Sequence, residues 1–135
     1  MADADTPNEA LVRKFFEDLS TGDLDKLRPL LHPEATWEAM GKTIPGAGAH
    51  KGHKGILDEF LGPVRGLFKP GDPKVTVRNL VGRGDLVGAE TEAHGHFANG
   101  TPYDNRYCWM VEIKDGKIFA LREYMDTAYI LSVVS

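Results

Sequence analysis

The chain has 135 residues and a formal net charge of −4, and its 16 lysines and arginines form no basic run, which argues against a nucleic-acid partner. This length is typical of one domain spanning residues 1–135. No apolar run reaches the roughly 18 residues of a membrane span, and the polar start MADADTPNEA does not resemble a signal peptide. The lone Cys108 fits a reducing compartment. We therefore expect a cytoplasmic protein without a membrane segment.

Helical signals dominate the first half of the chain. Thr6-Pro7-Asn8-Glu9 has the cap, proline and glutamate spacing of a helix start, and Leu11, Phe15 and Leu19 then recur at helical spacing. Thr21-Gly22-Asp23 ends this helix and begins a shorter, leucine-rich one that stops before His32-Pro33.

A short strand is predicted over Ala35 to Met40, before a glycine-rich run. A third helix is predicted from His53 to about Phe68, poor or broken because of its internal glycines and Pro63.

Strands dominate from Lys74 onward. Turn signals, of which Asp115-Gly116 is a strong hairpin signal, separate four predicted strands: Val75 to Val81, Leu86 to Phe97, Tyr103 to Lys114 and Lys117 to Met125. Hairpin-linked strands after helices predict an α+β domain with a mostly antiparallel sheet.

The strand from Tyr103 separates into two faces, because side chains alternate across a sheet. Tyr107, Trp109, Val111 and Ile113 mark its covered face, and Asn105 lies among them in need of a hydrogen-bond partner.

In the last strand, Glu123 falls in the more apolar set. It is either a strand-end carboxylate that reaches solvent or pairs with an arginine, or a carboxyl group held in a cavity, where burial raises its pKa and suits it to proton transfer.

The stretch AETEAHGH, residues 89–96, places Glu90, Glu92, His94 and His96 on one face of a strand. Small residues form the other face and could pack closely under a helix. The residues alone therefore leave open which face is buried.

Two stretches, FFEDLSTGDLDKLRPLLHPEATWEAMG and GTPYDNRYCWMVEIKDGKIFALREYMD, resemble the SnoaL-like branch of the nuclear transport factor 2-like superfamily, which includes ketosteroid isomerases, limonene epoxide hydrolase and polyketide cyclases. The resemblance implies a cystatin-like cone, in which a curved sheet wraps around three N-terminal helices and encloses a pocket. It also implies a homodimer formed through the outer face of the sheet.

The same resemblance turns AETEAHGH toward the pocket. The implied catalytic residues are His94, paired with Glu92, and Glu123 as a second acid or base. The implied substrate-binding residues are Trp37, Glu90, Asn105, Tyr107, Trp109, Leu121 and Met125.

Two departures argue against ordinary steroid isomerisation. The catalytic tyrosine and the general-base aspartate of ketosteroid isomerases fall at Phe15 and Ala39, and neither side chain can transfer a proton. The Asp-Arg-Asp set of limonene epoxide hydrolase falls on Glu92, Glu90 and Glu123. Both acids are therefore kept as glutamates, but the arginine between them is replaced by a third acid.

The leading hypothesis is therefore a cofactor-independent proton-transfer enzyme of isomerase, cyclase, hydratase or epoxide-hydrolase type, acting on a small apolar cyclic or carbonyl compound. The alternative is a non-catalytic ligand-binding or dimeric accessory domain, which the missing catalytic sets favour. A metal site at His94 and His96 is a minor alternative, because two imidazoles on one strand face can ligate zinc or iron.

Overall fold

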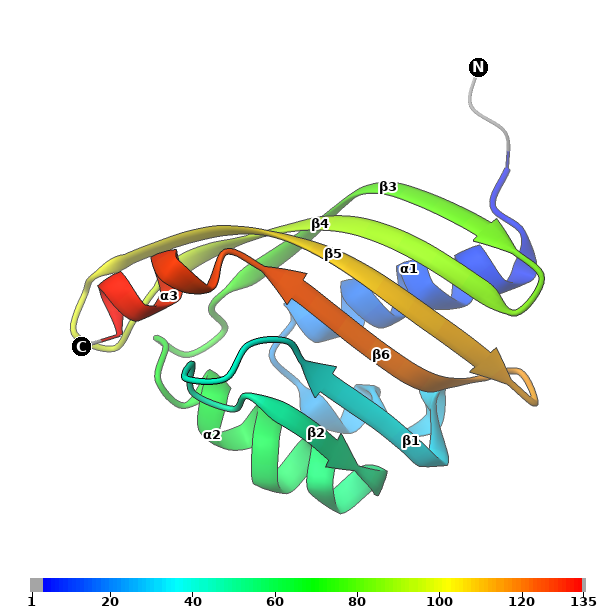
Figure 1. Cartoon of the computed structure of the whole chain (residues 1–135), viewed down its shortest axis with the longest axis horizontal. Helices are drawn as coiled ribbons and strands as arrows, with labels where there is room; N and C mark the ends of the chain where they lie inside the picture. The colour runs from blue at the N-terminus through cyan, green and yellow to red at the C-terminus, as the bar shows by residue number, and fades with distance from the viewer. Residues whose placement is uncertain (1–3, 135) are drawn as a thin grey trace.

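The computed structural model describes residues 4–134 (Figure 1). Its first half contains α1 (Pro7–Ser20), the 3-10 turns η1 (Leu24–Lys26) and η2 (Arg28–Leu30), β1 (Leu31–Ala39), β2 (Gly48–Lys51), η3 (Lys54–Leu61) and α2 (Gly62–Arg65). Its second half contains β3 (Lys74–Arg83), β4 (Leu86–His96), β5 (Pro102–Lys114), β6 (Lys117–Met125) and α3 (Thr127–Val133).

The six strands form one sheet in the order β2-β1-β6-β5-β4-β3. Strand β1 runs parallel to β6, and the other neighbouring pairs are antiparallel. The long strands curve, and the hairpin turns between β3 and β4 and between β5 and β6 lie at the same end of the sheet (Figure 1). The predicted α+β fold with a curved, mostly antiparallel sheet is confirmed.

The helices differ in detail from the sequence prediction. Thr6 and Glu9 form the expected capping box at the start of α1. The second predicted helix is instead two 3-10 turns, and Pro29, which lacks an N–H group, lies in the second of them. The third begins as a π-helix and continues as the four residues of α2, with the change at Gly62-Pro63. Strand β2 and helix α3 were not predicted.

The apolar stripe of α1 packs against two tryptophans of the sheet. The rings of Phe16 and Trp109 lie 5.0 Å apart between centroids, and those of Phe15 and Trp37 lie 5.9 Å apart. All four side chains are buried. Helix α1 therefore holds the two tryptophans in place through edge and tilted aromatic contacts, which large rings favour over a face-to-face sandwich.

Strand β4 presents the opposite face from the one expected from the family resemblance. Glu90 and His94 are exposed and Glu92 is partly exposed on the convex face, so the prediction that these three residues line the pocket is wrong. The buried residues on the concave face are the small ones, Ala89, Thr91 and Ala93. Small side chains leave room for α1 and for Trp109, whose Nε1 donates a hydrogen bond to the Thr91 hydroxyl at 2.9 Å.

The displaced charged residues form a network on the convex face instead. Arg78 donates two hydrogen bonds to Glu92, at 2.9 and 2.7 Å, and the hydrogen bonds from Arg78 and then His94 lower the pKa of Glu92. The imidazole of His94 is hydrogen-bonded to Asp104 at 2.7 Å and to Glu92 at 3.4 Å, and both contacts raise its pKa. Solvated ion pairs of this kind are ordinary surface contacts, so this network does not indicate a binding cavity.

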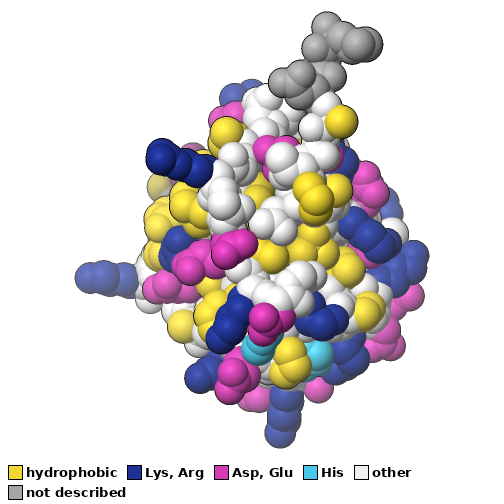
Figure 2. Space-filling view, turned by 90° about the vertical axis from the view of Figure 1, so that its right-hand side faces the viewer, with side chains coloured by type: hydrophobic (Ala, Val, Ile, Leu, Met, Phe, Trp, Pro, Cys, Tyr) yellow, Lys and Arg dark blue, Asp and Glu magenta, His cyan; other side chains and the backbone are white. Residues whose placement is uncertain are grey.

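Charges of both signs are interspersed on the end of the molecule that carries the β3–β4 and β5–β6 turns (Figure 2). Hydrophobic side chains are visible between them, and this face offers no extended basic surface of the kind that nucleic-acid binding needs. Within residues 4–134, no helix is long and apolar enough to cross a membrane.

The hydrogen bond between Trp109 and Thr91 should contribute measurably to the free energy of unfolding. Thr91→Val preserves the shape of the side chain but leaves the buried indole N–H without its acceptor, which should cost about 1–3 kcal/mol of unfolding free energy. Urea denaturation checks this value. Thr76→Val, on the exposed face of β3, is the matched control and should change stability by less than about 0.5 kcal/mol; equal effects of the two variants would show that the buried hydrogen bond contributes nothing.

Candidate functional site

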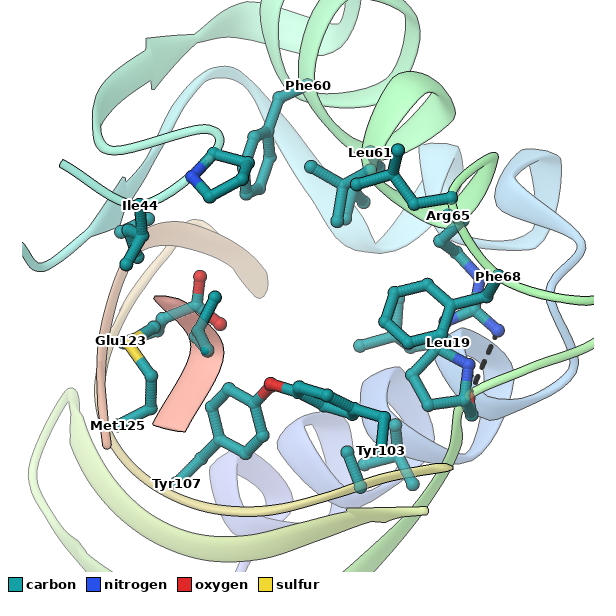
Figure 3. A pocket seen from close by; sticks show the side chains of 18 of the residues that line it. Leu19, Ile44, Phe60, Leu61, Arg65, Phe68, Tyr103, Tyr107, Glu123 and Met125 are labelled. Carbon is teal, nitrogen blue, oxygen red and sulfur yellow. Dashed lines mark hydrogen bonds between the residues drawn. The ribbon is translucent and has the colours of Figure 1, made fainter. Parts of the chain in front are cut away.

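A cavity lies between the concave face of the sheet and the helical segments, and it encloses about 870 Å³ with its open mouth included (Figure 3). Strands β1, β4, β5 and β6 supply one wall, and η3 and α2 supply the other. Ile130 of α3 and Val134 beyond it also line the cavity. A cavity with a mostly apolar lining suits a small organic molecule.

Glu123 is the acidic residue of the cavity lining. Its side chain is 7% exposed, and Oε1 accepts a hydrogen bond from Trp37 Nε1 at 3.1 Å. Within residues 4–134 its other carboxyl oxygen has no hydrogen-bond partner, and no cationic group lies in ion-pair range. Figure 3 shows the carboxyl group pointing into the open space. One oxygen is thus fixed, while the other can meet a ligand.

Burial raises the pKa of Glu123 to about 7, and the hydrogen bond from Trp37 only partly opposes this shift. A carboxyl group in apolar surroundings resists ionisation because it loses the hydration that its charged form needs. A group that titrates near neutral pH can both take up and release a proton under physiological conditions.

Strand pairing explains the position of this carboxyl group. Glu123 lies beside Ala39 of the parallel strand β1 and beside Trp109 of the antiparallel strand β5. Ala39 also lines the cavity, and its methyl group leaves space for the glutamate. Trp37, two residues earlier on the same face of β1, reaches the carboxyl group with its indole nitrogen.

Aromatic rings surround the acid. The Trp37 ring lies 5.3 Å from the Trp109 ring and 5.3 Å from the Phe60 ring between centroids, and Tyr107 stacks on Trp109 at 5.9 Å. These rings form a rigid, apolar wall, so a flat or cyclic hydrophobic molecule would bury much of its surface there.

Two tyrosines of β5 place hydroxyl groups in the cavity, 2.5 Å apart (Figure 3). Burial raises the pKa of Tyr103 and raises that of Tyr107 well above its usual value, so both hydroxyls are protonated at neutral pH. Asn105 Nδ2 donates to the Tyr103 hydroxyl at 3.0 Å, and its Oδ1 accepts from the Arg106 backbone N–H at 2.9 Å. The amide is therefore held in one orientation.

The structure brings together only part of the predicted site. Five of the predicted residues line the cavity, namely Trp37, Tyr107, Trp109, Glu123 and Met125. Asn105 and Leu121 are buried but do not line it, so Asn105 contacts Tyr103 instead of open space. The convex-face residues Glu90, Glu92 and His94 contribute nothing to the cavity.

Several cavity residues were missed by sequence reasoning. Tyr103, the first residue of its predicted strand, was not assigned to the site. Arg65 and Phe60 lie in a segment whose glycines and proline made its conformation uncertain. The sequence does contain a signal for α3, because Asp126 is a good N-cap residue and precedes an apolar run. In the structure its carboxylate accepts a hydrogen bond from the Tyr129 N–H at 2.9 Å.

The minor metal-site alternative gains no support from the geometry. His94 and His96 both lie on the convex side of β4. His94 is hydrogen-bonded to acids, and His96 Nδ1 lies 3.9 Å from Asp72 Oδ2. The described part of the chain holds no group of three or more histidine, cysteine, aspartate or glutamate side chains that could ligate a metal ion.

Comparison with known proteins agrees with the expected family. Residues 12–121 match the model of the SnoaL-like domain. No match was found among curated proteins.

Three solved structures are similar over almost their full length. TerC co-crystallised with polyporic acid is 21% identical, with a TM-score of 0.84, and covers 95% of this chain and 98% of its own. A nuclear transport factor 2-like protein of unknown function from Burkholderia pseudomallei is 16% identical, with a TM-score of 0.86 and coverages of 97% and 99%. A candidate SnoaL-like polyketide cyclase from Jannaschia sp. CCS1 is 19% identical, with a TM-score of 0.77 and coverages of 99% and 98%.

The raised pKa of Glu123 predicts how the free energy of unfolding depends on pH. The folded-state pKa of about 7 exceeds the ordinary value of 4.5, so the stability that Glu123 contributes is fully present below pH 4.5 and is lost as the pH rises toward and through 7. Glu123→Gln has no charge to bury. Above pH 8 we expect it to be more stable than the wild type by about 3 kcal/mol, and near pH 4.5 by almost nothing.

Denaturant unfolding of both proteins at pH 4.5, 6, 7 and 8.5 measures this difference. Glu112→Gln, which removes a partly exposed carboxylate on the convex face, is the control and should not gain stability with pH. A constant difference between wild type and Glu123→Gln would contradict the raised pKa.

Proposed function

Since the chain belongs to the SnoaL-like domain family, we propose that its cavity binds a small apolar cyclic carbonyl compound and that Glu123 transfers a proton within it, without a cofactor. The observation that carries the proposal is the Glu123 carboxyl group, which is buried, titrates near neutral pH and presents one oxygen to the cavity. The co-crystallisation of TerC, a protein of this fold, with polyporic acid supports a small-molecule ligand.

In the proposed step, the Glu123 carboxylate removes a proton from a carbon next to the carbonyl group. The electron pair of the broken C–H bond moves onto the carbonyl oxygen and gives an enolate. The protonated Glu123 can return the proton to the same carbon or to another one, and the second outcome is an isomerisation. A single acid is enough for this chemistry, because it acts first as base and then as acid.

Tyr107 is the proposed donor to the enolate oxygen. Asn105 donates to the Tyr103 oxygen, which favours donation of the Tyr103 proton to Tyr107 and leaves the Tyr107 proton free to point into the cavity. A donor fixed in advance stabilises charge that develops in the transition state. Asn105 is then a positioning residue that acts through Tyr103, and not a direct contact of the substrate as expected from the sequence.

This arrangement differs from that of steroid isomerases in where the acid originates. The positions that carry their tyrosine and aspartate hold Phe15, which is buried in the core, and Ala39, which lies beside Glu123. The proposed base thus belongs to the strand next to the one that carries the aspartate in those enzymes.

The alternative function is a non-catalytic carrier or accessory domain. The aromatic walls favour ligand binding whether or not chemistry follows, since four rings surround the space beside Glu123. The two functions are separated by proton exchange: a carrier binds a ketone without exchanging its hydrogens.

We also propose a homodimer formed through the convex face of the sheet. Tyr124, which is 44% exposed, and Cys108 are neighbours there in the β5–β6 register, and Val81 adds an apolar side chain that is 72% exposed. Sedimentation velocity should give a dimer for the wild type and a monomer for Tyr124→Glu, because a charge at this site would be costly to bury. A monomeric wild type would contradict the dimer and leave the cavity proposal unaffected.

Proton transfer can be tested without the natural substrate. 2-Tetralone is a flat bicyclic ketone with acidic hydrogens next to its carbonyl, and ¹H NMR in D₂O follows their replacement by deuterium. We expect the wild type to accelerate exchange above the buffer rate, with a rate that rises with pH and levels off above about pH 7, where Glu123 is ionised.

Glu123→Gln should reduce the enzyme-dependent exchange by about 100-fold or more, and Tyr107→Phe by about 10-fold. His94→Gln, on the convex face, is the control and should exchange at the wild-type rate. Exchange that survives in Glu123→Gln would overturn the assignment of Glu123, and binding of the ketone without exchange in the wild type would favour the carrier function.

A further inference from the structure

Arg65, the last residue of α2, contributes a cation to the lining of a mostly apolar cavity. Its side chain lies across the cavity from Glu123 (Figure 3). The Arg65 side chain is partly buried, and this loss of hydration lowers the pKa of its guanidinium. A partly desolvated arginine is costly to keep unless something satisfies its N–H groups.

The protein itself satisfies only a small part of this donor capacity. Arg65 Nη2 donates to the backbone oxygen of Pro73 at 3.2 Å, and no other hydrogen bond from the guanidinium forms within residues 4–134. A guanidinium carries five N–H donors in a planar fork. Four of them therefore form no hydrogen bond within the described residues.

No carboxylate of the described chain forms an ion pair with Arg65. Asp72 is the acid whose charge acts on it, but the Asp72 carboxylate accepts from the His96 backbone N–H at 2.9 Å. Two arginines of the convex face differ, since Arg78 is paired with Glu92 and Arg122 with Glu112. Arg65 is thus a cation held at the edge of an apolar space without a partner of its own.

We propose that the ligand of this cavity is an apolar ring compound that carries one anionic oxygen group, such as a carboxylate, and that Arg65 binds this group. The planar fork of a guanidinium matches two oxygens of a carboxylate, and the bonds are strengthened by charge and by exclusion of water. The inference deepens the function proposed above, because it names the substrate class of the same cavity.

The opposite placement of the two charged groups supports this orientation. An anionic group near Glu123 would repel its carboxylate and raise its pKa further, whereas an anionic group at Arg65 stays at the far side of the cavity. The ring would then lie against the aromatic wall, and the carbonyl end would face Glu123 and Tyr107. Arg65 would therefore determine which end of the ligand meets the acid.

A matched pair of dyes tests the proposal. 8-Anilinonaphthalene-1-sulfonate and N-phenyl-1-naphthylamine share one ring system and differ by the sulfonate, and both fluoresce more strongly in apolar surroundings. Titrations at pH 6, where Glu123 is mostly protonated, separate the contribution of Arg65 from that of the acid. We expect Arg65→Gln to weaken binding of the sulfonate about 10-fold, and binding of the uncharged amine less than about 2-fold.

Two further variants make the result specific. Arg65→Lys keeps the charge but not the fork, so it should retain part of the preference for the sulfonate. Arg78→Gln removes a cation of the convex face and should leave both affinities unchanged. Equal loss of both dyes in Arg65→Gln would indicate a structural role through Pro73, and it would overturn the proposal, as would an unchanged affinity for the sulfonate or its failure to bind the wild type.

Glu123→Gln keeps this test independent of the catalytic proposal. It should retain the dependence of sulfonate binding on Arg65, because the anion lies at the other side of the cavity. A loss of ketone exchange with an intact sulfonate preference assigns the two residues to separate tasks. Intact exchange in Glu123→Gln would reject the proton-transfer role and leave anion binding standing.

Discussion

A carboxyl group inside an apolar cavity either stays protonated or ionises at a cost, and Glu123 has one fixed donor, Trp37, to reduce that cost. The position of Trp37 depends in turn on Phe15 of α1 and on the rings of Phe60 and Trp109. The aromatic core therefore has two roles in one arrangement. It packs α1 against the sheet, and it keeps the acid dry enough to titrate near pH 7.

The small residues of β4 make this arrangement possible. Ala89 and Ala93 leave room on the concave face for the large rings, and Thr91 gives the indole of Trp109 an acceptor. The charged residues of the same strand are consequently confined to the convex face. The cavity holds one acid and one cation on opposite sides, Glu123 and Arg65, with rings and two tyrosine hydroxyls between them. Such a layout can orient a polar, ring-shaped ligand.

Much of the fold was predictable from local signals. The site was predictable only where the residues of a strand showed which of its faces is buried. Asp115-Gly116 marked the β5–β6 hairpin, and Trp109 identified the covered face that Tyr107 shares. Strand β4 gave no such indication, since its acidic and small faces were both compatible with burial until helix packing decided between them. The role of Arg65 depends on long-range geometry, because neither its distance from Glu123 nor its lack of a carboxylate partner can be read from a broken helical pattern.

The pKa of Glu123 is the quantity on which the account most directly depends. ¹³C NMR of protein labelled at the glutamate Cδ atoms, with Glu123→Gln used to assign the signal, measures the titration of this one group. The account predicts a midpoint near pH 7 for Glu123. A midpoint near the ordinary 4.5 would show that the carboxyl group is well hydrated and would contradict its role as a proton-transfer group in a dry cavity.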